Sequence, residues 1–173
     1  MAVRKLLIYP NPFLLKVSNP IEKIDEEVKD LARDLIDTMY SSEGIGLAAP
    51  QIGVNKRIFV MDCTTEDQKN DCKVVINPMV ECLSEELNTY REGCLSIPGI
   101  TEEISRPKII NVVYQDTKGV LQRHTFDDLW STCFQHELDH LDGKLFIDHL
   151  RPMKQTLVKN RIKKSAKKNE NKA

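Results

Sequence analysis

The chain has 173 residues, of which 40% are hydrophobic and 29% charged, and its formal net charge at pH 7 is −1. These values are typical of one globular domain with its own core. No stretch is apolar enough to span a membrane, and the short apolar run at residues 6–9 is too brief for a signal peptide, so we expect a cytoplasmic protein.

The first predicted element is a helix that begins after residue 24. Residues 1–24 contain prolines and are expected to wrap the surface in extended form. Three acidic residues, 25–27, then favour the positive end of a helix. Apolar residues follow at helical spacing and predict its buried stripe: Val28, Leu31, Ala32, Leu35, Ile36 and Met39. We expect this helix to end near residues 41–44.

The middle of the chain, residues 57–126, has a β-like pattern. Short apolar runs at 58–61 and 74–76 predict buried strands. The segments 109–114 and 120–126 flank a turn sequence and predict a hairpin. Strands that follow one helix and precede others indicate an α+β domain.

Two helices are predicted after these strands. Thr125, Asp127 or Asp128 is expected to cap the first, whose inner face includes Leu129, Cys133 and Leu141. The second is amphipathic and begins after Pro152. Its inward-facing residues are predicted to be Leu157, Val158 and Ile162.

The first of these helices carries the pattern His-Glu-x-x-His. One turn separates His136 from His140, so the two rings lie about 40° apart on one face and can bind a single metal ion. Glu137 projects beside them and cannot easily reach the same ion, which leaves it free to transfer protons. The pattern indicates a metal-dependent hydrolase.

A catalytic site of this kind usually has a third protein ligand. Cys133 lies on the right face, but about 10 Å of helix separates it from His140, so we interpret it as a pocket wall or core residue. His149 could bind only if the chain folds back. The longer protease pattern with a third histidine fails, because Phe146 occupies that position.

Cys94 is the better candidate for the third ligand. Glycines and a proline bound its segment, residues 91–99, and such a segment can bring backbone close to a ligand. A thiolate favours Fe²⁺, Zn²⁺ or Ni²⁺ over Mg²⁺ or Ca²⁺. The five cysteines form no CxxC pair, so we expect free thiols.

Residues 44–51 form a third informative segment, Gly-Ile-Gly-Leu-Ala-Ala-Pro-Gln. Its small residues permit close backbone approach. It lacks the pattern of a phosphate-binding loop. Gln51 is a candidate donor to a developing oxyanion.

Together, three segments resemble the motifs of the peptide deformylase family: GIGLAAPQ at 44–51, EGCLSIP at 92–98 and QHELDH at 135–140. The resemblance runs from about residue 3 to residue 154. It implies small, mostly antiparallel sheets around a central helix that carries the HExxH pattern, with a helix at the C-terminus. It also implies one catalytic domain over residues 1–152, followed by a basic helix and tail over 153–173.

The implied reaction is hydrolysis of the N-formyl group from the N-terminal methionine of newly synthesised proteins, with release of formate. The implied ligands of one divalent ion are Cys94, His136 and His140. Fe²⁺ is the expected native ion, and Zn²⁺ or Ni²⁺ can replace it. Glu137 would take a proton from water and pass it to the leaving amine. The side chain of Gln51 and the backbone N–H of Leu95 would donate to the oxyanion.

The resemblance also implies how N-formylmethionyl nascent peptides bind. The peptide would add as a β-strand beside Ile45, Gly46 and Gly93. The pocket for the methionine side chain would be formed by Ile45, Tyr90, Leu129, Cys133 and the ring of His136. Thr132 stands where an apolar residue is common in the family. Glu92 is also expected among the substrate-binding residues. It and Arg106 match an ion pair that could brace the segment that carries Cys94 (residues 91–99, the cysteine loop).

The C-terminal segment is strongly basic. Residues 151–173 contain nine Lys or Arg and one acidic residue, whereas the remainder contains 16 basic and 25 acidic residues. A basic tail on an acidic body favours a polyanionic partner. Similar enzymes dock a C-terminal helix on the ribosome near the exit tunnel, so we expect this contact and neither a membrane nor a DNA partner.

Two other hypotheses share these motifs. A zinc-type endoprotease would take its third ligand downstream, from Asp148 or His149, and would keep its metal in Cys94→Ala. A ribosome- or RNA-binding module would use a closed structural metal site, and Glu137→Gln would leave it functional.

Overall fold

The structure is a computed structural model that describes residues 2–65 and 70–170. Within these residues, the α-helices are α1 (Glu26–Ser41), α2 (Asp128–Leu141) and α3 (Pro152–Glu170). The strands are β1 (Gly46–Ala48), β2 (Ile58–Met61), β3 (Lys73–Leu83), β4 (Leu87–Cys94), β5 (Ile97–Pro107), β6 (Ile109–Gln115) and β7 (Leu121–Asp127). Short 3-10 helices are η1 (Pro12–Leu15), η2 (Ala49–Ile52) and η3 (Phe146–His149).

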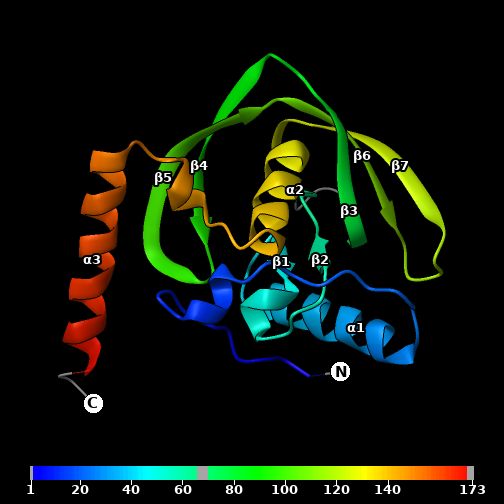
Figure 1. Ribbon diagram of the computed structural model, residues 1–173, viewed down its shortest axis with the longest axis horizontal. Helices are drawn as coiled ribbons and strands as arrows, with labels where there is room; N and C mark the ends of the chain where they lie inside the picture. Colours follow the sequence, from blue (N-terminus) through cyan, green and yellow to red (C-terminus); the bar gives the residue numbers. More distant parts are fainter. Residues whose placement is uncertain (1, 66–69, 171–173) are drawn as a thin grey trace.

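The strands form two antiparallel sheets around α2. One sheet has the order β1-β2-β3-β6-β7, and the other is the β4–β5 hairpin. Figure 1 shows α2 at the centre of the molecule, with the β4–β5 hairpin on one side and β3, β6 and β7 on the other. The predicted α+β class with small antiparallel sheets is confirmed. No helix among the described residues is long and apolar enough to cross a membrane.

Strand β2 is fully buried because a helix covers each of its faces. Ile58 and Val60 belong to the apolar cluster built on α1. Phe59 and Met61 alternate with them and belong to the cluster that includes residues of α2. Burial on both faces explains why the predicted strand at 58–61 is a continuous apolar run.

Helix α1 forms where the acidic start and apolar spacing predict it. The side chain of Asp25 accepts a hydrogen bond from the backbone N–H of Val28 at 3.2 Å, which caps the helix. Five of the six predicted stripe residues are buried, and Ile36 is half-buried. The chain leaves the helix through a bond from the Gly44 N–H to the Met39 carbonyl at 3.0 Å, and it then enters β1.

The prediction that a side chain caps the start of α2 is wrong. Asp127 stands at the N-cap position, but its side chain makes no capping hydrogen bond. The other two candidates bond to neighbouring strands instead, since Thr125 donates to Asn111 at 2.8 Å and Asp128 accepts from Asn88 at 2.6 Å. Helix α2 is therefore fixed by its packing between the sheets.

Helix α3 packs against the rest of the protein with fewer apolar residues than predicted. Val158 and Ile162 are buried against β5 and η3, but Leu157 is 60% exposed. Residues four apart share a helix face, whereas a neighbouring residue points about 100° away, so Leu157 lies outside the contact. An ion pair between Lys154 Nζ and Glu102 Oε2, 2.7 Å apart, joins α3 to β5.

The β4–β5 hairpin places the cysteine loop beside α2. Its strands are paired from Leu87 and Pro107 down to Cys94 and Ile97, with an irregularity at Gly93. Ile97, Ile100 and other apolar residues of this hairpin pack on η3 and α3. The tip of the hairpin is thereby held against the helix that carries the two histidines.

Candidate metal centre

The three predicted ligand residues meet between the β4–β5 hairpin and α2. They are Cys94, His136 and His140, which together form the metal group. Cys94 ends β4, and His136 and His140 lie one turn apart on α2. Their ligand atoms all lie within 4.8 Å of one another, and Cys94 Sγ is 3.2 Å from His140 Nε2. Among the described residues, no other group of three or more His, Cys, Asp or Glu side chains is arranged to hold a metal ion.

The charges of this group suit a divalent cation. Burial would raise the pKa of the Cys94 thiol, but the two imidazoles beside it lower that pKa well below its usual value. Burial would lower the pKa of His136, but hydrogen bonds to Cys94 and Glu92 raise it well above the ordinary value. A lowered pKa favours the thiolate form of Cys94, which is the form that binds a metal. One thiolate and two ring nitrogens fit a borderline transition metal.

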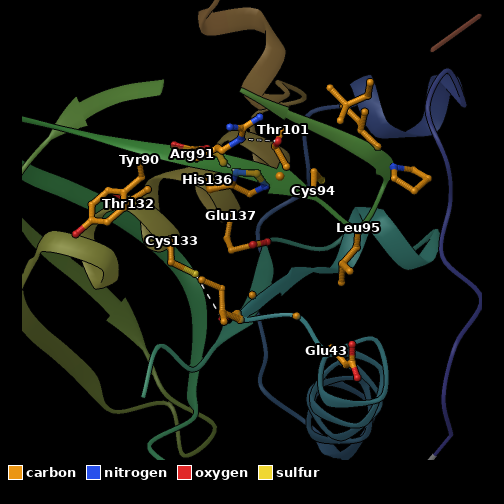
Figure 2. Close-up of a pocket in the computed structure, with 18 of the residues that line it drawn as sticks. Glu43, Tyr90, Arg91, Cys94, Leu95, Thr101, Thr132, Cys133, His136 and Glu137 are labelled. Carbon is orange, nitrogen blue, oxygen red and sulfur yellow. Dashed lines mark hydrogen bonds and ion pairs between the residues drawn. The ribbon is translucent and has the colours of Figure 1, made fainter. Parts of the chain in front are cut away.

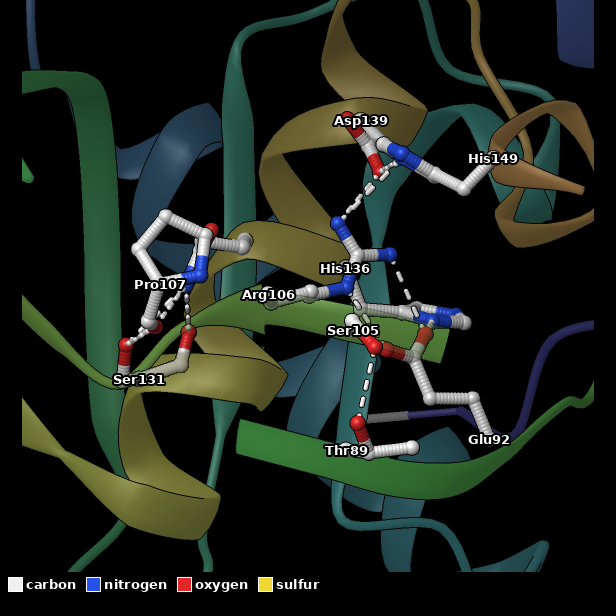
Figure 3. A network of polar contacts seen from close by, with 10 residues as sticks. Thr89, Glu92, Ser105, Arg106, Pro107, Ser131, His136, Asp139 and His149 are labelled. Carbon is white, nitrogen blue, oxygen red and sulfur yellow. Dashed lines mark hydrogen bonds and ion pairs between the residues drawn. The ribbon is translucent and has the colours of Figure 1, made fainter. Parts of the chain in front are cut away.

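A buried carboxylate orients His136 (Figure 3). His136 Nδ1 donates to Glu92 Oε2 at 2.9 Å, which leaves Nε2 of the ring for the metal group. Arg106 donates to both oxygens of Glu92, from Nε at 2.6 Å and Nη2 at 3.1 Å. Burial would raise the pKa of Glu92, but the bonds from His136 and Arg106 hold it below its usual value. The expected Glu92–Arg106 ion pair therefore supports the candidate ligand His136 directly.

The network continues to Asp139, which sequence reasoning did not assign to the site. Arg106 Nη1 donates to Asp139 Oδ2 at 2.8 Å, and His149 Nε2 lies 2.7 Å from the same oxygen. His149, the possible downstream ligand, thus contacts Asp139 and lies outside the metal group. Asp148 is held by the Leu145 N–H and by Gln155. The ligand set of the endoprotease hypothesis is not assembled in this structure.

Glu137 lies beside the metal group and is free to exchange a proton. It is 4% exposed, and its Oε2 has no hydrogen-bond partner among the described residues. Burial raises the pKa of Glu137 to about 7, against the opposing charges of the imidazoles. A Cβ at Gly46 would clash with the Glu137 carboxylate and lie 2.9 Å from Cys133 Sγ. Glycine at position 46 is what lets the carboxylate lie against β1.

Gln51, on η2, is oriented toward the metal group by the last residue of β1. Its Oε1 accepts the Ala48 N–H at 2.8 Å, which turns Nε2 toward Cys94 Sγ at 3.5 Å and Ser96 Oγ at 3.2 Å. Gln51 is 2% exposed. Leu95 lies in the turn that joins β4 to β5. A side-chain amide thus points at the group from one side, and the turn after Cys94 borders it on another.

These groups open into a cavity of about 480 Å³. Figure 2 shows it between the cysteine loop, α2 and the segment before β1. Its walls include every residue predicted to bind substrate: Ile45, Gly46, Tyr90, Glu92, Gly93, Leu129 and Cys133. Thr132 also lines it. Sequence reasoning missed three polar residues of its walls, Glu43, Arg91 and Thr101, because no motif marks them.

Comparison with known proteins gives one family. The model of the family described as polypeptide deformylase matches residues 3–156. Proteins named peptide deformylase from Bartonella henselae and Rhizobium meliloti are each 47% identical over 96% of this chain, covering 95% and 96% of their own lengths. The crystal structure of peptide deformylase from Ehrlichia chaffeensis superposes with a TM-score of 0.90 at 34% identity, over 97% of this chain and 99% of that one. The chain therefore belongs to the polypeptide deformylase family.

Proposed function

We propose that this protein hydrolyses the formamide bond of peptides that begin with N-formylmethionine and releases formate. The observation that carries the proposal is the Cys94, His136 and His140 group at the base of an open cavity. It lies next to the buried carboxylate of Glu137, whose Oε2 has no hydrogen-bond partner in the part of the chain that the structure describes. Membership of the deformylase family supports the same activity.

Cys94, His136 and His140 would hold one divalent ion. We propose Fe²⁺ as the native ion, with Zn²⁺ or Ni²⁺ as substitutes, because a thiolate and two imidazoles favour these metals over Mg²⁺. When bound, the ion would supply Lewis acidity that activates water near neutral pH and polarises the formyl carbonyl.

The chain's own residues would move the proton and stabilise the developing charge. The free Oε2 of Glu137 can accept a proton from water and return it to the leaving amine, and burial, which raises the pKa of this carboxyl, favours the proton uptake. Gln51 Nε2 and the Leu95 N–H are the proposed donors to the oxyanion. Loss of one such donor typically raises the barrier by about 2.7–4 kcal/mol.

The cavity accounts for recognition of one side chain and a peptide backbone. We propose that Leu129, Thr132 and Cys133 receive the methionine side chain, beside Ile45 and Tyr90. The extended backbone would pair near Gly46 and Gly93, as in other β-strand additions. Main-chain pairing is blind to most side chains, which suits an enzyme that acts on many nascent proteins.

We further propose a catalytic domain over residues 1–152 and a ribosome-contacting segment over 153–173 in a cytoplasmic protein. Helix α3 buries Val158 and Ile162, while Arg161, Lys163 and Lys164 remain exposed. A basic face of this kind suits RNA phosphates near the ribosomal exit tunnel, and such binding should weaken steeply with salt.

A formate-release assay tests the activity. Anaerobically prepared protein should release formate from formyl-Met-Ala-Ser, and a chelator should stop the release. Glu137→Gln should retain metal and lose turnover, because only the proton acceptor changes. Absence of formate from metal-loaded, anaerobic wild-type protein would contradict the proposed function.

A further inference from the structure

One charged side chain in the cavity wall has no role in the proposed reaction. Arg91 is the only lysine or arginine that lines the cavity among the described residues. It lies on β4, three residues before Cys94, and is exposed. A positive side chain in the cavity wall can affect which peptides bind, although it has no part in the proposed hydrolysis.

The guanidinium of Arg91 turns along the hairpin toward the loop that follows β4. Its Nε donates to Thr101 Oγ1 at 2.9 Å, the contact drawn in Figure 2. In the strand register Arg91 faces Glu103, whereas Thr101 faces Gly93, two residues nearer the metal group. Arg91 thus contacts the residue opposite Gly93 instead of pairing with its cross-strand acid.

The remaining donors of this guanidinium are available. Across residues 2–65 and 70–170, the contact with Thr101 is the one hydrogen bond of the Arg91 side chain, and it forms no ion pair. The other arginine next to the cavity wall, Arg106, is buried and bonded to Glu92 and Asp139. Holding Nε fixed leaves the two terminal NH₂ groups for a planar acceptor, and a carboxylate is the acceptor that matches them.

We propose that Arg91 is a specificity-determining residue that favours an acidic side chain at the second or third position of the formyl peptide. The inference rests on the proposed function, because it requires the peptide backbone to pass Gly93. Successive side chains of an extended peptide point to opposite sides. With the methionine in the apolar pocket, the second side chain points away from that pocket and the third points back toward its side, so one of the two passes Arg91 on the cavity wall.

The test compares amidated peptides that differ by one charge. Formyl-Met-Ala-Asp and formyl-Met-Asp-Ala are each paired with the matching Asn peptide, and kcat/KM is measured from formate release. Because Arg91 is exposed, wild-type protein should prefer Asp over Asn by about twofold to fivefold at one of the two positions. Higher salt should reduce this preference, since it screens exposed charges.

Variants separate a local effect from one of overall charge. Arg91→Gln should remove the preference for Asp, and Arg91→Glu should reverse it. The matched control is Arg123→Gln, which removes the same charge from β7, at a residue that does not line the cavity. It should keep the wild-type preference.

The two proposals fail in different ways. Equal Asp/Asn ratios in wild type and Arg91→Gln, with normal turnover of the Asn peptides, would overturn the role of Arg91 alone. A loss of preference in Arg123→Gln as large as in Arg91→Gln would overturn it too. If wild-type protein turned over none of the peptides, the proposed deformylase activity would fall, and the role of Arg91 with it.

Discussion

At the scale of single residues, Gly46 controls where Glu137, the proposed proton acceptor, can lie. An added methyl group would overlap the Glu137 carboxylate and crowd Cys133 Sγ. We expect Gly46→Ala to lower kcat/KM by about 100-fold, because displacing a catalytic group by ~1 Å costs this much. Formate release and metal content measure the effect, and the metal content should stay unchanged.

A second glycine in the same segment provides the control. A Cβ at Gly44 would meet the flexible end of the Leu95 side chain, 2.9 Å away, and no atom of Glu137. Gly44→Ala should therefore lose much less activity. Equal losses in the two variants would show that the segment before β1, and not the position of Glu137, limits turnover.

The pKa of Glu137 predicts the acidic side of the pH profile. Burial raises this pKa from 4.5 to about 7 in the absence of metal. A bound divalent cation favours the ionised form and lowers the pKa again. Because the carboxylate must be ionised to accept a proton, kcat/KM of metal-loaded protein should fall as the pH drops through a pKa between these two values. A profile that stays flat down to pH 4.5 would contradict this role.

Sequence reasoning found the residues that motifs mark and missed those that only the fold brings in. Cys94 lies 42 residues before His136 in the sequence, yet glycines and a proline around it indicated a loop that can approach a ligand. Asp139 lies within QHELDH and Arg91 begins the segment 91–99, but nothing at either position distinguishes the residue from a solvated charge. Their partners, Arg106 and Thr101, become neighbours only through the pairing of β4 with β5 and its docking on α2.

At the scale of elements, Arg106 joins the hairpin to α2. It lies on β5, is 3% exposed, and bonds to Glu92 on β4 and Asp139 on α2. Arg106→Ala should destabilise the protein by about 3–5 kcal/mol, because it leaves buried carboxylates without their partner. It should also weaken metal binding by about 10–100-fold, since Glu92 would no longer be held against His136.

Urea unfolding and metal titration measure the two effects of Arg106→Ala. Lys108→Ala is the matched control, because it breaks an exposed pair with Glu86, 2.9 Å apart, just beyond the end of β5. Exposed pairs contribute little, so this control should change neither quantity appreciably. A similar loss of metal affinity in both variants would argue against the buried network.

The same elements show where periodicity predicts structure and where it fails. Helix α1 and strand β2 each bury a continuous or regularly spaced apolar set, so their limits were predictable. Strands β4 and β5 were expected only as part of a β-like region, because one face of the hairpin is polar and exposed. Leu157 was wrongly predicted to be buried, because both it and Val158 are apolar. Only the packing of α3 on β5 shows that Val158 is the buried one.

At the scale of the whole molecule, the metal group brings together the β4–β5 sheet and the central helix. Cys94 belongs to the β4–β5 sheet, whereas α2 packs its histidine-bearing turn between that sheet and the five-stranded one. An ion held by all three side chains would therefore bridge the hairpin and the central helix. It would bind the folded state and not the unfolded chain, so metal and stability should be linked.

This linkage predicts the effect of metal removal. Free metal at about 1,000 times its dissociation constant stabilises a protein by about 4.1 kcal/mol, and for a chain of this size that corresponds to a rise in Tm of about 8–16 °C. Calorimetry of metal-loaded and chelated wild-type protein should show this difference. Cys94→Ala should abolish most of it, because two histidines alone do not join the hairpin to α2. The exposed Cys82 provides the control, since Cys82→Ala removes a thiol outside the metal group and should retain the full shift. An equal Tm with and without metal in wild-type protein, or a full shift in Cys94→Ala, would mean that the sulfur does not hold the ion.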